Sequence, residues 1–156
     1  MEIGPDGKPC RACSDFKSWM KMGGTGKEQT NKAVSAKKVE EKKPCPPDVN
    51  EIGRGTWTLL HTMSVYLPEN DLSQQQKSDA TQFMNILARN YPCSHCADDL
   101  KEDLKIIPPQ VKTGQDFANW MCRLHNKVNT KLGKKEFDCS QVYQRWRDGY
   151  PDRSCD

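Results

Sequence analysis

Apolar residues recur every three to four positions through most of the chain after residue 45, which is the repeat of an amphipathic helix. Prolines and glycines interrupt the pattern and divide it into stretches over residues 48–67, 74–91, 93–107, 113–132 and, more briefly, 140–149. None of these stretches alternates apolar and polar residues with the two-residue period of a strand. The chain is therefore predicted to be all-α, a four-helix bundle plus a short fifth helix.

The apolar positions of two stretches define helix faces that are expected to be buried. In the first stretch these positions are Val49, Ile52, Thr56, Leu59, Leu60 and Met63. In the fourth they are Phe117, Trp120, Met121, Leu124, Val128 and Leu132. Asp48, Ser73 and Thr113 are the expected N-caps of the first, second and fourth helices, because their side-chain oxygens accept bonds from the free amides of a first turn.

The first 44 residues differ in composition from the rest of the chain. They carry the basic excess behind the net charge of +3, with several glycines and few apolar residues. Such a segment buries too little surface to offset the entropy of ordering it, so residues 1–44 are expected to form a flexible arm. Residues 45–156 are expected to form the folded domain. No apolar run reaches the ~20 residues that span a bilayer, and no secretory signal is expected.

Eight cysteines are the main chemical feature of the sequence. They are Cys10, Cys13, Cys45, Cys93, Cys96, Cys122, Cys139 and Cys155. Two pairs have C-x-x-C spacing, which occurs in zinc sites and in redox-active dithiols. Because far more than the roughly 15–20 residues usual for zinc separate the pairs, the spacing favours a redox role. Zinc ligation and purely structural disulfides remain the alternatives.

The pair Cys93 and Cys96 lies where the third helix is expected to begin. The unpaired amides at a helix N-terminus carry a partial positive charge, which favours a thiolate over a thiol. A gap of two residues on a helical turn brings the two sulfurs within bonding reach. This arrangement suits dithiol–disulfide exchange, in which the thiolate is the attacking species. His95 between them could tune the thiolate, but it is expected to face solvent.

The remaining cysteines of the helical region have two different expected roles. A bond between Cys122 and Cys139 would stabilise the domain by ~3 kcal/mol through loop entropy and would serve as a structural staple. Cys45 and Cys155 lie near the two ends of the helical region, where a bond within one chain and a bond between two chains both fit.

A dithiol oxidant needs an electron acceptor, and several residues have the chemistry to hold a planar cofactor. They are Trp57, His61, Trp120, His125, Asn126, Asn129, Lys131 and Trp146. His125, Asn126 and Asn129 share a polar strip on an otherwise apolar helix, and polar groups on a buried helix need partners. Lys131 and Lys134 could meet phosphates. The alternative is an ordinary aromatic core with an exposed polar strip.

Five segments together resemble the Erv/ALR family of FAD-linked sulfhydryl oxidases. They are Pro46–His61 with its Gly53-Arg54-Gly-Thr-Trp57 run, Tyr91-Pro-Cys-Ser-His-Cys96, Trp120–Leu132, Phe137-Asp-Cys139 and Arg145-Trp-Arg-Asp-Gly149. The likeness covers residues 45–155. The N-terminal Cys10-Arg-Ala-Cys13 and the terminal Ser154-Cys155-Asp156 are similar to the long form of the family. The resemblance implies a helical bundle that holds FAD.

The resemblance also implies a relay of electrons through two cysteine pairs. Cys10 and Cys13 on the arm would accept electrons from a client dithiol and pass them to Cys93 and Cys96. Cys93 would exchange with the incoming dithiol, while Cys96 would face the flavin. FAD would then pass the electrons to O2, giving H2O2, or to cytochrome c.

The resemblance further assigns the other cysteines and the cofactor contacts. Cys122 and Cys139 would form a structural disulfide, and Cys45 and Cys155 would join the subunits of a homodimer. FAD contacts are implied at Gly53, Arg54, Trp57, His61, Tyr91, Cys122, His125, Asn126, Val128, Asn129, Lys131, Lys134 and Trp146.

The family context implies a partner and a compartment for the chain. The expected thiol client is the import oxidoreductase of the mitochondrial intermembrane space, where the chain itself would act. Binding to nucleic acid, insertion into a membrane and a bound metal are not expected. A disulfide-linked, growth-factor-like signalling ligand without turnover is the alternative from another class of function.

Overall fold

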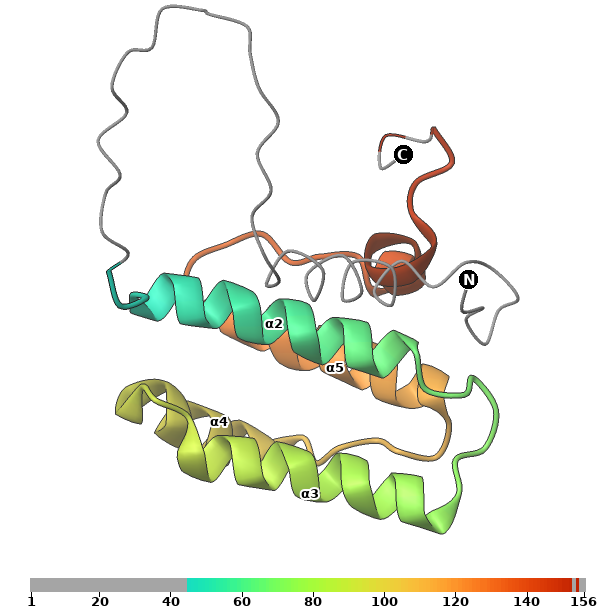
Figure 1. Ribbon diagram of the computed structural model, residues 1–156, viewed down its shortest axis with the longest axis horizontal. Coiled ribbons are helices and arrows are strands. Elements are labelled where there is room, and N and C mark those ends of the chain that lie inside the picture. The colour runs from blue at the N-terminus through green and yellow to red at the C-terminus, as the bar shows by residue number, and fades with distance from the viewer. Residues whose placement is uncertain (1–44, 153, 155–156) are drawn as a thin grey trace, which may run out of the picture. The chain divides into compact units, whose positions relative to one another are not determined.

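The computed structural model describes residues 45–152 and residue 154. Its helices are α2 (Val49–Val65), α3 (Gln74–Asn90), α4 (Ser94–Ile106) and α5 (Gly114–Lys131). They form two layers, with α2 lying along α5 and α3 lying along α4 (Figure 1). The described residues contain no β-strand, only an isolated bridge between Asp71 and Thr113. The predicted all-α, four-helix architecture is therefore confirmed.

The expected fifth helix is present as two short turns of different kinds. Residues Cys139–Gln141 form the 3-10 turn η1, and residues Gln144–Asp148 form the π-helical turn η2. Gly149 ends the segment with a φ of 79°, a conformation that favours glycine. Helical periodicity located this segment correctly but did not distinguish these turns from a regular α-helix. The predicted arm over residues 1–44 lies outside the described residues.

The helix starts follow the capping signals in the sequence. Asp48, Ser73 and Thr113 are N-caps, and each forms a capping box with the third residue of its helix. Cys93 is the N-cap of α4, so the C-x-x-C pair begins that helix as predicted. After α5 the chain reverses at Gly133, whose φ is +67°.

The main core lies between the two helix layers. Its buried members are Leu60, Met84, Ala88, Leu104, Phe117, Trp120, Met121 and Leu124. Trp120 is 1% exposed, and its indole N–H donates a hydrogen bond of 2.9 Å to the backbone carbonyl of Ile107. This bond satisfies the polar atom of a buried ring and ties the loop before α5 to that helix.

A second, smaller core anchors the turns η1 and η2 to the α2–α5 layer. Its buried residues are Val65, Ala118, Cys122 and Val142. Cys122 and Cys139 form a disulfide with a Cα–Cα distance of 5.7 Å, which joins α5 to η1. The predicted staple is therefore confirmed, and by loop entropy it contributes about 3 kcal/mol.

Part of the predicted apolar stripe faces outward. The predicted burial of four residues was wrong: Val49 is 50% exposed, Leu59 55%, Met63 44% and Leu132 61%. Helix α2 packs instead through Leu60 and, one turn later, through Ser64 and Val65. The hydroxyl of Ser64 donates a 2.8 Å hydrogen bond to the backbone carbonyl of His61 in the same helix. The apolar stripe of α2 is wider than the surface that the neighbouring helix covers.

The connection between α2 and α3 packs closely against the start of α5. The amide of Gly114 donates a 3.0 Å hydrogen bond to the carbonyl oxygen of Pro68, and an added Cβ at this glycine would overlap that oxygen. A glycine is required here by close approach rather than by an unusual φ angle. Among the described helices, none combines the length and the apolar character needed to cross a membrane.

Candidate active site

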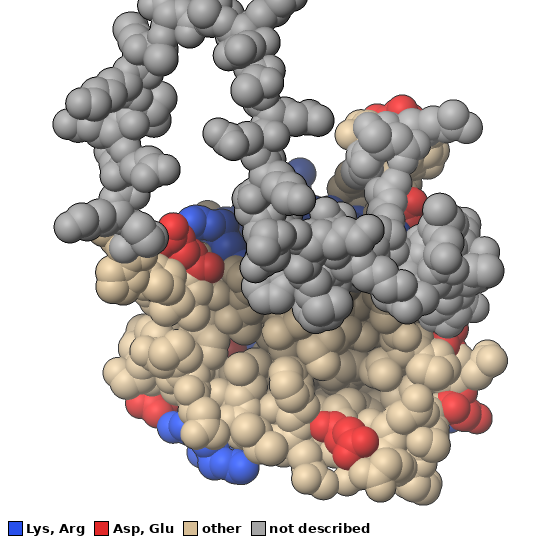
Figure 2. Space-filling model, in the orientation of Figure 1, with Lys and Arg blue, Asp and Glu red and all other residues tan. Residues whose placement is uncertain are grey.

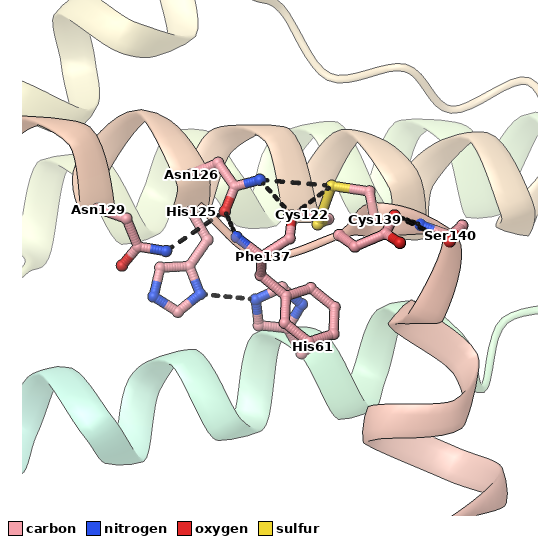
Figure 3. Close-up of a disulfide and its surroundings, with 9 residues drawn as sticks. His61, Cys122, His125, Asn126, Asn129, Phe137, Cys139 and Ser140 are labelled. Atoms are coloured by element: carbon pink, nitrogen blue, oxygen red, sulfur yellow. Dashed lines mark hydrogen bonds between the residues drawn. A yellow bond between two sulfur atoms is a disulfide. The ribbon is translucent and has the colours of Figure 1, made fainter. Parts of the chain in front are cut away.

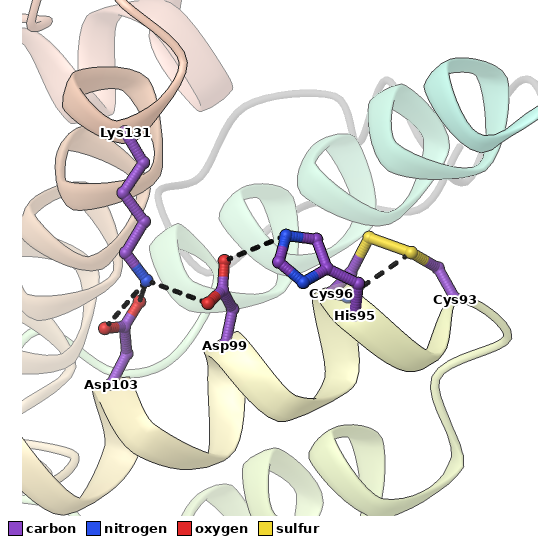
Figure 4. Close-up of polar contacts among 6 residues, drawn as sticks. All are labelled: Cys93, His95, Cys96, Asp99, Asp103 and Lys131. Carbon is purple, nitrogen blue, oxygen red and sulfur yellow. Dashed lines mark hydrogen bonds and ion pairs between the residues drawn. A yellow bond between two sulfur atoms is a disulfide. The ribbon is translucent and has the colours of Figure 1, made fainter.

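The pair Cys93 and Cys96 forms a disulfide at the first turn of α4 (Figure 4). Their Cα atoms are 5.3 Å apart, and both residues are half-buried. The backbone amide of Cys96 donates a hydrogen bond of 3.3 Å to the sulfur of Cys93. A thiolate formed at Cys93 would therefore receive this amide hydrogen together with the positive end of the helix dipole.

His95 points away from the disulfide, as expected. Its side chain is 88% exposed, and its Nε2 lies 3.9 Å from an oxygen of Asp99. An ion pair this long and this exposed contributes little to stability. The expectation that His95 faces solvent is confirmed.

Two pairs of stacked rings lie where α2, α5 and η2 meet. The rings of Trp57 and His125 are 4.0 Å apart between centroids and tilted by 3°, and those of His61 and Trp146 are 4.6 Å apart and tilted by 2°. The two pairs adjoin, because the centroids of His61 and His125 are 5.1 Å apart. Four of the residues predicted to surround a planar cofactor are thus brought together from three separate elements.

The two histidines share one hydrogen bond and are both uncharged near neutral pH. Nε2 of His61 lies 2.9 Å from Nδ1 of His125, so one ring donates and the other accepts. Burial, then the neighbouring charges of His125 and Arg145, lowers the pKa of His61 to about 3. Burial, then the charge of Lys134, lowers the pKa of His125 to about 4. The other nitrogen of His61, Nδ1, is buried and has no hydrogen-bond partner among residues 45–152 and 154.

The predicted polar strip of α5 finds its partners in the chain segment before η1 (Figure 3). The side-chain amide of Asn126 donates to the carbonyl oxygen of Phe137 at 2.8 Å and accepts from the amide of the same residue at 2.9 Å. Asn129 donates to the oxygen of Asn126 at 3.3 Å. Asn126 therefore holds residues 137–139 against α5, next to the Cys122–Cys139 disulfide.

The burial of the Asp103 carboxylate between α4 and α5 was not predicted from the sequence. This carboxylate accepts from Lys131 at 3.1 and 3.2 Å and forms an ion pair with Lys127 at 2.8 Å. Burial disfavours the charged form of Lys131, but the hydrogen bonds and charges of Asp103 and Asp99 outweigh it and raise the pKa of Lys131. The only sequence signal for Asp103 is its place beside Leu104, within the apolar face of α4.

The other predicted cofactor residues lie on the helices or directly after them. Gly53 and Arg54 lie on α2, Tyr91 caps the end of α3, Val128 lies on α5, and Lys134 follows α5. Arg145 belongs to a family segment but was not predicted to contact the cofactor, and its guanidinium lies 4.4 Å from the centre of the Trp146 ring. Cys45 is exposed, while Cys10, Cys13 and Cys155 lie outside the described residues.

The sequence of residues 54–147 matches the family model described as the Erv1 / Alr family. The chain belongs to this family. The Erv1/Alr resemblance drawn from the sequence motifs is thereby confirmed.

Two FAD-linked sulfhydryl oxidases illustrate the similarity of the chain to its relatives. The mitochondrial FAD-linked sulfhydryl oxidase ERV1 of Saccharomyces cerevisiae is 36% identical over 93% of this chain and 86% of the relative. The FAD-linked sulfhydryl oxidase ERV1 of Oryza sativa subsp. japonica is 42% identical over 75% of this chain and 60% of the relative.

Solved Erv1 structures match the helical region of the chain. The crystal structure of the yeast Erv1 core has a TM-score of 0.68 and 40% identity, covering 76% of this chain and 99% of that one. The crystal structure of the FAD binding domain of Erv1 from Saccharomyces cerevisiae has a TM-score of 0.64 and 42% identity, covering 67% of this chain and 99% of that one. The Erv1/Alr fold therefore includes the part of the chain that carries the ring cluster and the disulfides.

The ring cluster of this Erv1/Alr chain fits a planar heteroaromatic group such as a flavin or an adenine. Trp57, His61, His125 and Trp146 offer flat faces for stacking, and Nδ1 of His61 is a buried polar atom that lacks a partner in the described part of the chain. Lys134, which follows α5, carries a positive charge that lowers the pKa of His125, and it is the basic residue beside the cluster that was predicted to meet phosphates. The residues present are therefore those that a dinucleotide cofactor would need.

Proposed function

We propose that the chain is an FAD-dependent thiol oxidase that makes disulfides in protein substrates, with Cys93 and Cys96 as its reacting pair. The observation that carries the proposal is a half-buried disulfide at the start of α4, in a chain of the Erv1/Alr family. The relatives named above are sulfhydryl oxidases, which favours turnover over a signalling ligand without turnover.

The Cys93–Cys96 disulfide oxidises an incoming dithiol, which is the reduced Cys10–Cys13 pair or a small dithiol such as dithiothreitol. A thiolate of that dithiol attacks the sulfur of Cys93, the Cys93–Cys96 bond breaks, and the sulfur of Cys96 leaves as a thiolate. The second thiol of the dithiol then attacks the mixed disulfide, so the dithiol becomes a disulfide and the pair at α4 is left as a dithiol. Two electrons pass from the dithiol to the Cys93–Cys96 pair, together with two protons. The amide of Cys96 stabilises the negative charge that the sulfur of Cys93 carries when it leaves the mixed disulfide.

FAD, when bound, supplies a two-electron acceptor that can also release electrons one at a time. Trp57, His61, His125 and Trp146 would hold its rings and exclude water from them. Lys134 forms no ion pair with any described residue, which leaves its charge available for a phosphate. Cofactor contacts at the remaining residues named from the family resemblance stay predictions.

A client relay and a terminal acceptor complete the proposed reaction. Cys10 and Cys13 would take electrons from the client, the import oxidoreductase, and pass them to the pair at α4. O2 or cytochrome c would be the final acceptor. Mitochondrial relatives support a mitochondrial location, and the intermembrane space is the compartment that we propose within it.

A homodimer is the proposed assembly. Helices α2 and α3 carry large apolar side chains that are exposed, including Leu59, Met63 and Ile86. The visible face over these helices has few charged side chains (Figure 2). A second copy that covers these exposed side chains would bury them. We propose that Cys45 and Cys155 then form the bonds between subunits.

Oxygen consumption with dithiothreitol tests the proposed function. Wild-type protein is expected to consume oxygen, and Cys93→Ser and Cys96→Ser are each expected to abolish this reaction. Cys10→Ser with Cys13→Ser is expected to spare it while stopping oxidation of the protein client. Turnover that persists in both Cys93→Ser and Cys96→Ser would show that another group reacts with thiols.

A further inference from the structure

Asp103 is the one carboxylate that is buried among the described residues. It lies on α4, about 10 Å along the helix from Cys96 at 1.5 Å per residue. Its side chain is 3% exposed. A buried carboxylate is costly unless cations and hydrogen bonds compensate it, so the residues that pair with Asp103 must stay in place.

Both cations that compensate Asp103 come from α5. Lys131 reaches both carboxylate oxygens, at 3.2 and 3.1 Å, and Lys127 reaches one of them at 2.8 Å. Lys131 also lies 3.5 Å from an oxygen of Asp99, one turn nearer to the cysteine pair (Figure 4). The three short contacts of the Lys131 ammonium are thus with carboxylates of α4, and an ammonium has three hydrogens to donate.

This pairing joins the two helices that the reaction must keep in register. Helix α4 begins with Cys93 and Cys96, while α5 carries His125 of the ring cluster. The apolar contacts of Leu104 with α5 resist separation of the helices, but apolar packing is non-directional. Asp103, in contrast, accepts directional hydrogen bonds from Lys131 and forms an ion pair with Lys127 one turn away, and these contacts oppose sliding and rotation of α4 along α5.

We propose that Asp103 is a positioning residue of the oxidase, which fixes the Cys93–Cys96 pair relative to the cofactor by clamping α4 to Lys127 and Lys131 of α5. This inference rests on the proposed function. It assigns Lys131 to the clamp rather than to a cofactor phosphate. Electron transfer between groups held on different helices depends on their geometry, and a displacement of about 1 Å can cost up to 100-fold in rate.

Anaerobic reduction of FAD-loaded protein by dithiothreitol, followed by flavin absorbance, tests the clamp. Asp103→Asn is expected to slow the limiting rate of flavin bleaching about tenfold, with the FAD dissociation constant within twofold of wild type. Lys131→Gln is expected to have the same two effects, and it leaves Asp103 paired with Lys127 should Asp103→Asn fold poorly. Asp98→Asn is the matched control, because Asp98 pairs with Lys101 on the same helix at an exposed position. Asp98→Asn is expected to change neither the rate of flavin bleaching nor the FAD dissociation constant.

Each other outcome has a definite meaning. Bleaching of Asp103→Asn and Lys131→Gln at the wild-type rate would overturn the clamp while the proposed function stands. A weakened FAD affinity in Lys131→Gln, with a normal bleaching rate, would overturn it in favour of a phosphate-binding lysine. A wild-type protein that binds FAD but is not bleached by dithiothreitol would overturn the proposed function itself.

Discussion

His61 on α2 and His125 on α5 meet through a single hydrogen bond of 2.9 Å between Nε2 and Nδ1. Each histidine also stacks on a tryptophan, so the hydrogen bond connects two pairs of stacked rings. At least one of the two imidazoles must be neutral to accept this bond, because a protonated ring has no acceptor nitrogen. Burial lowers the pKa values of both rings, so the cluster is uncharged near neutral pH.

The free energy of unfolding of the domain is expected to decrease as the pH is lowered, because of these two histidines. Their pKa values are lowered to about 3 and about 4 in the folded chain, while the unfolded values lie near 6.5. Between pH 6.5 and 4 the unfolded chain binds more protons, so stability is lost as the pH decreases. Each histidine contributes a slope of up to about 1.4 kcal/mol per pH unit.

Urea unfolding between pH 6.5 and 4.5 measures this slope. His125→Phe keeps a flat ring against Trp57 but removes one titrating group, so its slope is expected to be shallower than that of wild type. His95→Gln is the control, because His95 is 88% exposed, and its slope is expected to match wild type. Equal slopes for wild type and His125→Phe would show that His125 is not held neutral by burial.

Trp57, which packs against the main core and stacks on His125, is also expected to contribute to cofactor affinity. Replacing it with alanine removes a stacking face and is expected to weaken FAD binding at least tenfold, whereas phenylalanine retains most of the affinity. Trp120→Phe is the matched comparison, since it removes the bond to Ile107 and is expected to cost about 1–3 kcal/mol of stability. Titration of the apoprotein with FAD measures the loss of affinity in Trp57→Ala, and urea unfolding measures the loss of stability in Trp120→Phe. Equal FAD affinities for wild type and Trp57→Ala would remove Trp57 from the site.

The Cys122–Cys139 disulfide is expected to stabilise the fold without taking part in electron transfer. A double Cys122→Ala, Cys139→Ala variant is expected to lose about 3 kcal/mol of unfolding free energy. At a temperature where it remains folded, it is expected to oxidise dithiothreitol at the wild-type rate. Complete loss of turnover in the folded double variant would instead place this disulfide in the electron path.

The close approach at the start of α5 makes Gly114 intolerant of a side chain. Gly114→Ala is expected to cost more than about 1 kcal/mol, because its Cβ would collide with the Pro68 carbonyl. Gly55→Ala is the control, since that position on α2 is open, and alanine there is expected to stabilise the helix by up to about 1 kcal/mol. Thermal unfolding of the two variants should shift in opposite directions, and a shift in the same direction would contradict the packing described.

Local signals predicted much of this structure. Capping residues placed the helix starts, the C-x-x-C motif was expected at the start of a helix, and the spacing of Cys122 and Cys139 allowed the staple that is present. All of these depend on neighbours in the sequence or on covalent geometry. Family motifs then grouped Trp57, His125 and other ring residues that come from separate helices.

Features set by tertiary packing were not predictable in the same way. Leu59 and Met63 have helical spacing, but only the placement of α5 decides which side of α2 is covered. Asp103 looks like a surface carboxylate in the sequence, because the lysines that compensate its burial lie on another helix. The π-helical form of η2 likewise has no signature in apolar periodicity.

The most direct test of the central claim is the flavin absorbance of FAD-loaded protein during anaerobic addition of dithiothreitol. The wild-type band is expected to bleach, because the reduced Cys93–Cys96 pair passes its electrons to the flavin. Cys96→Ser is expected to keep the oxidised band under the same conditions, while the Cys122→Ala, Cys139→Ala variant bleaches like wild type. Bleaching of Cys96→Ser at the wild-type rate would contradict the assignment of this pair as the oxidising centre.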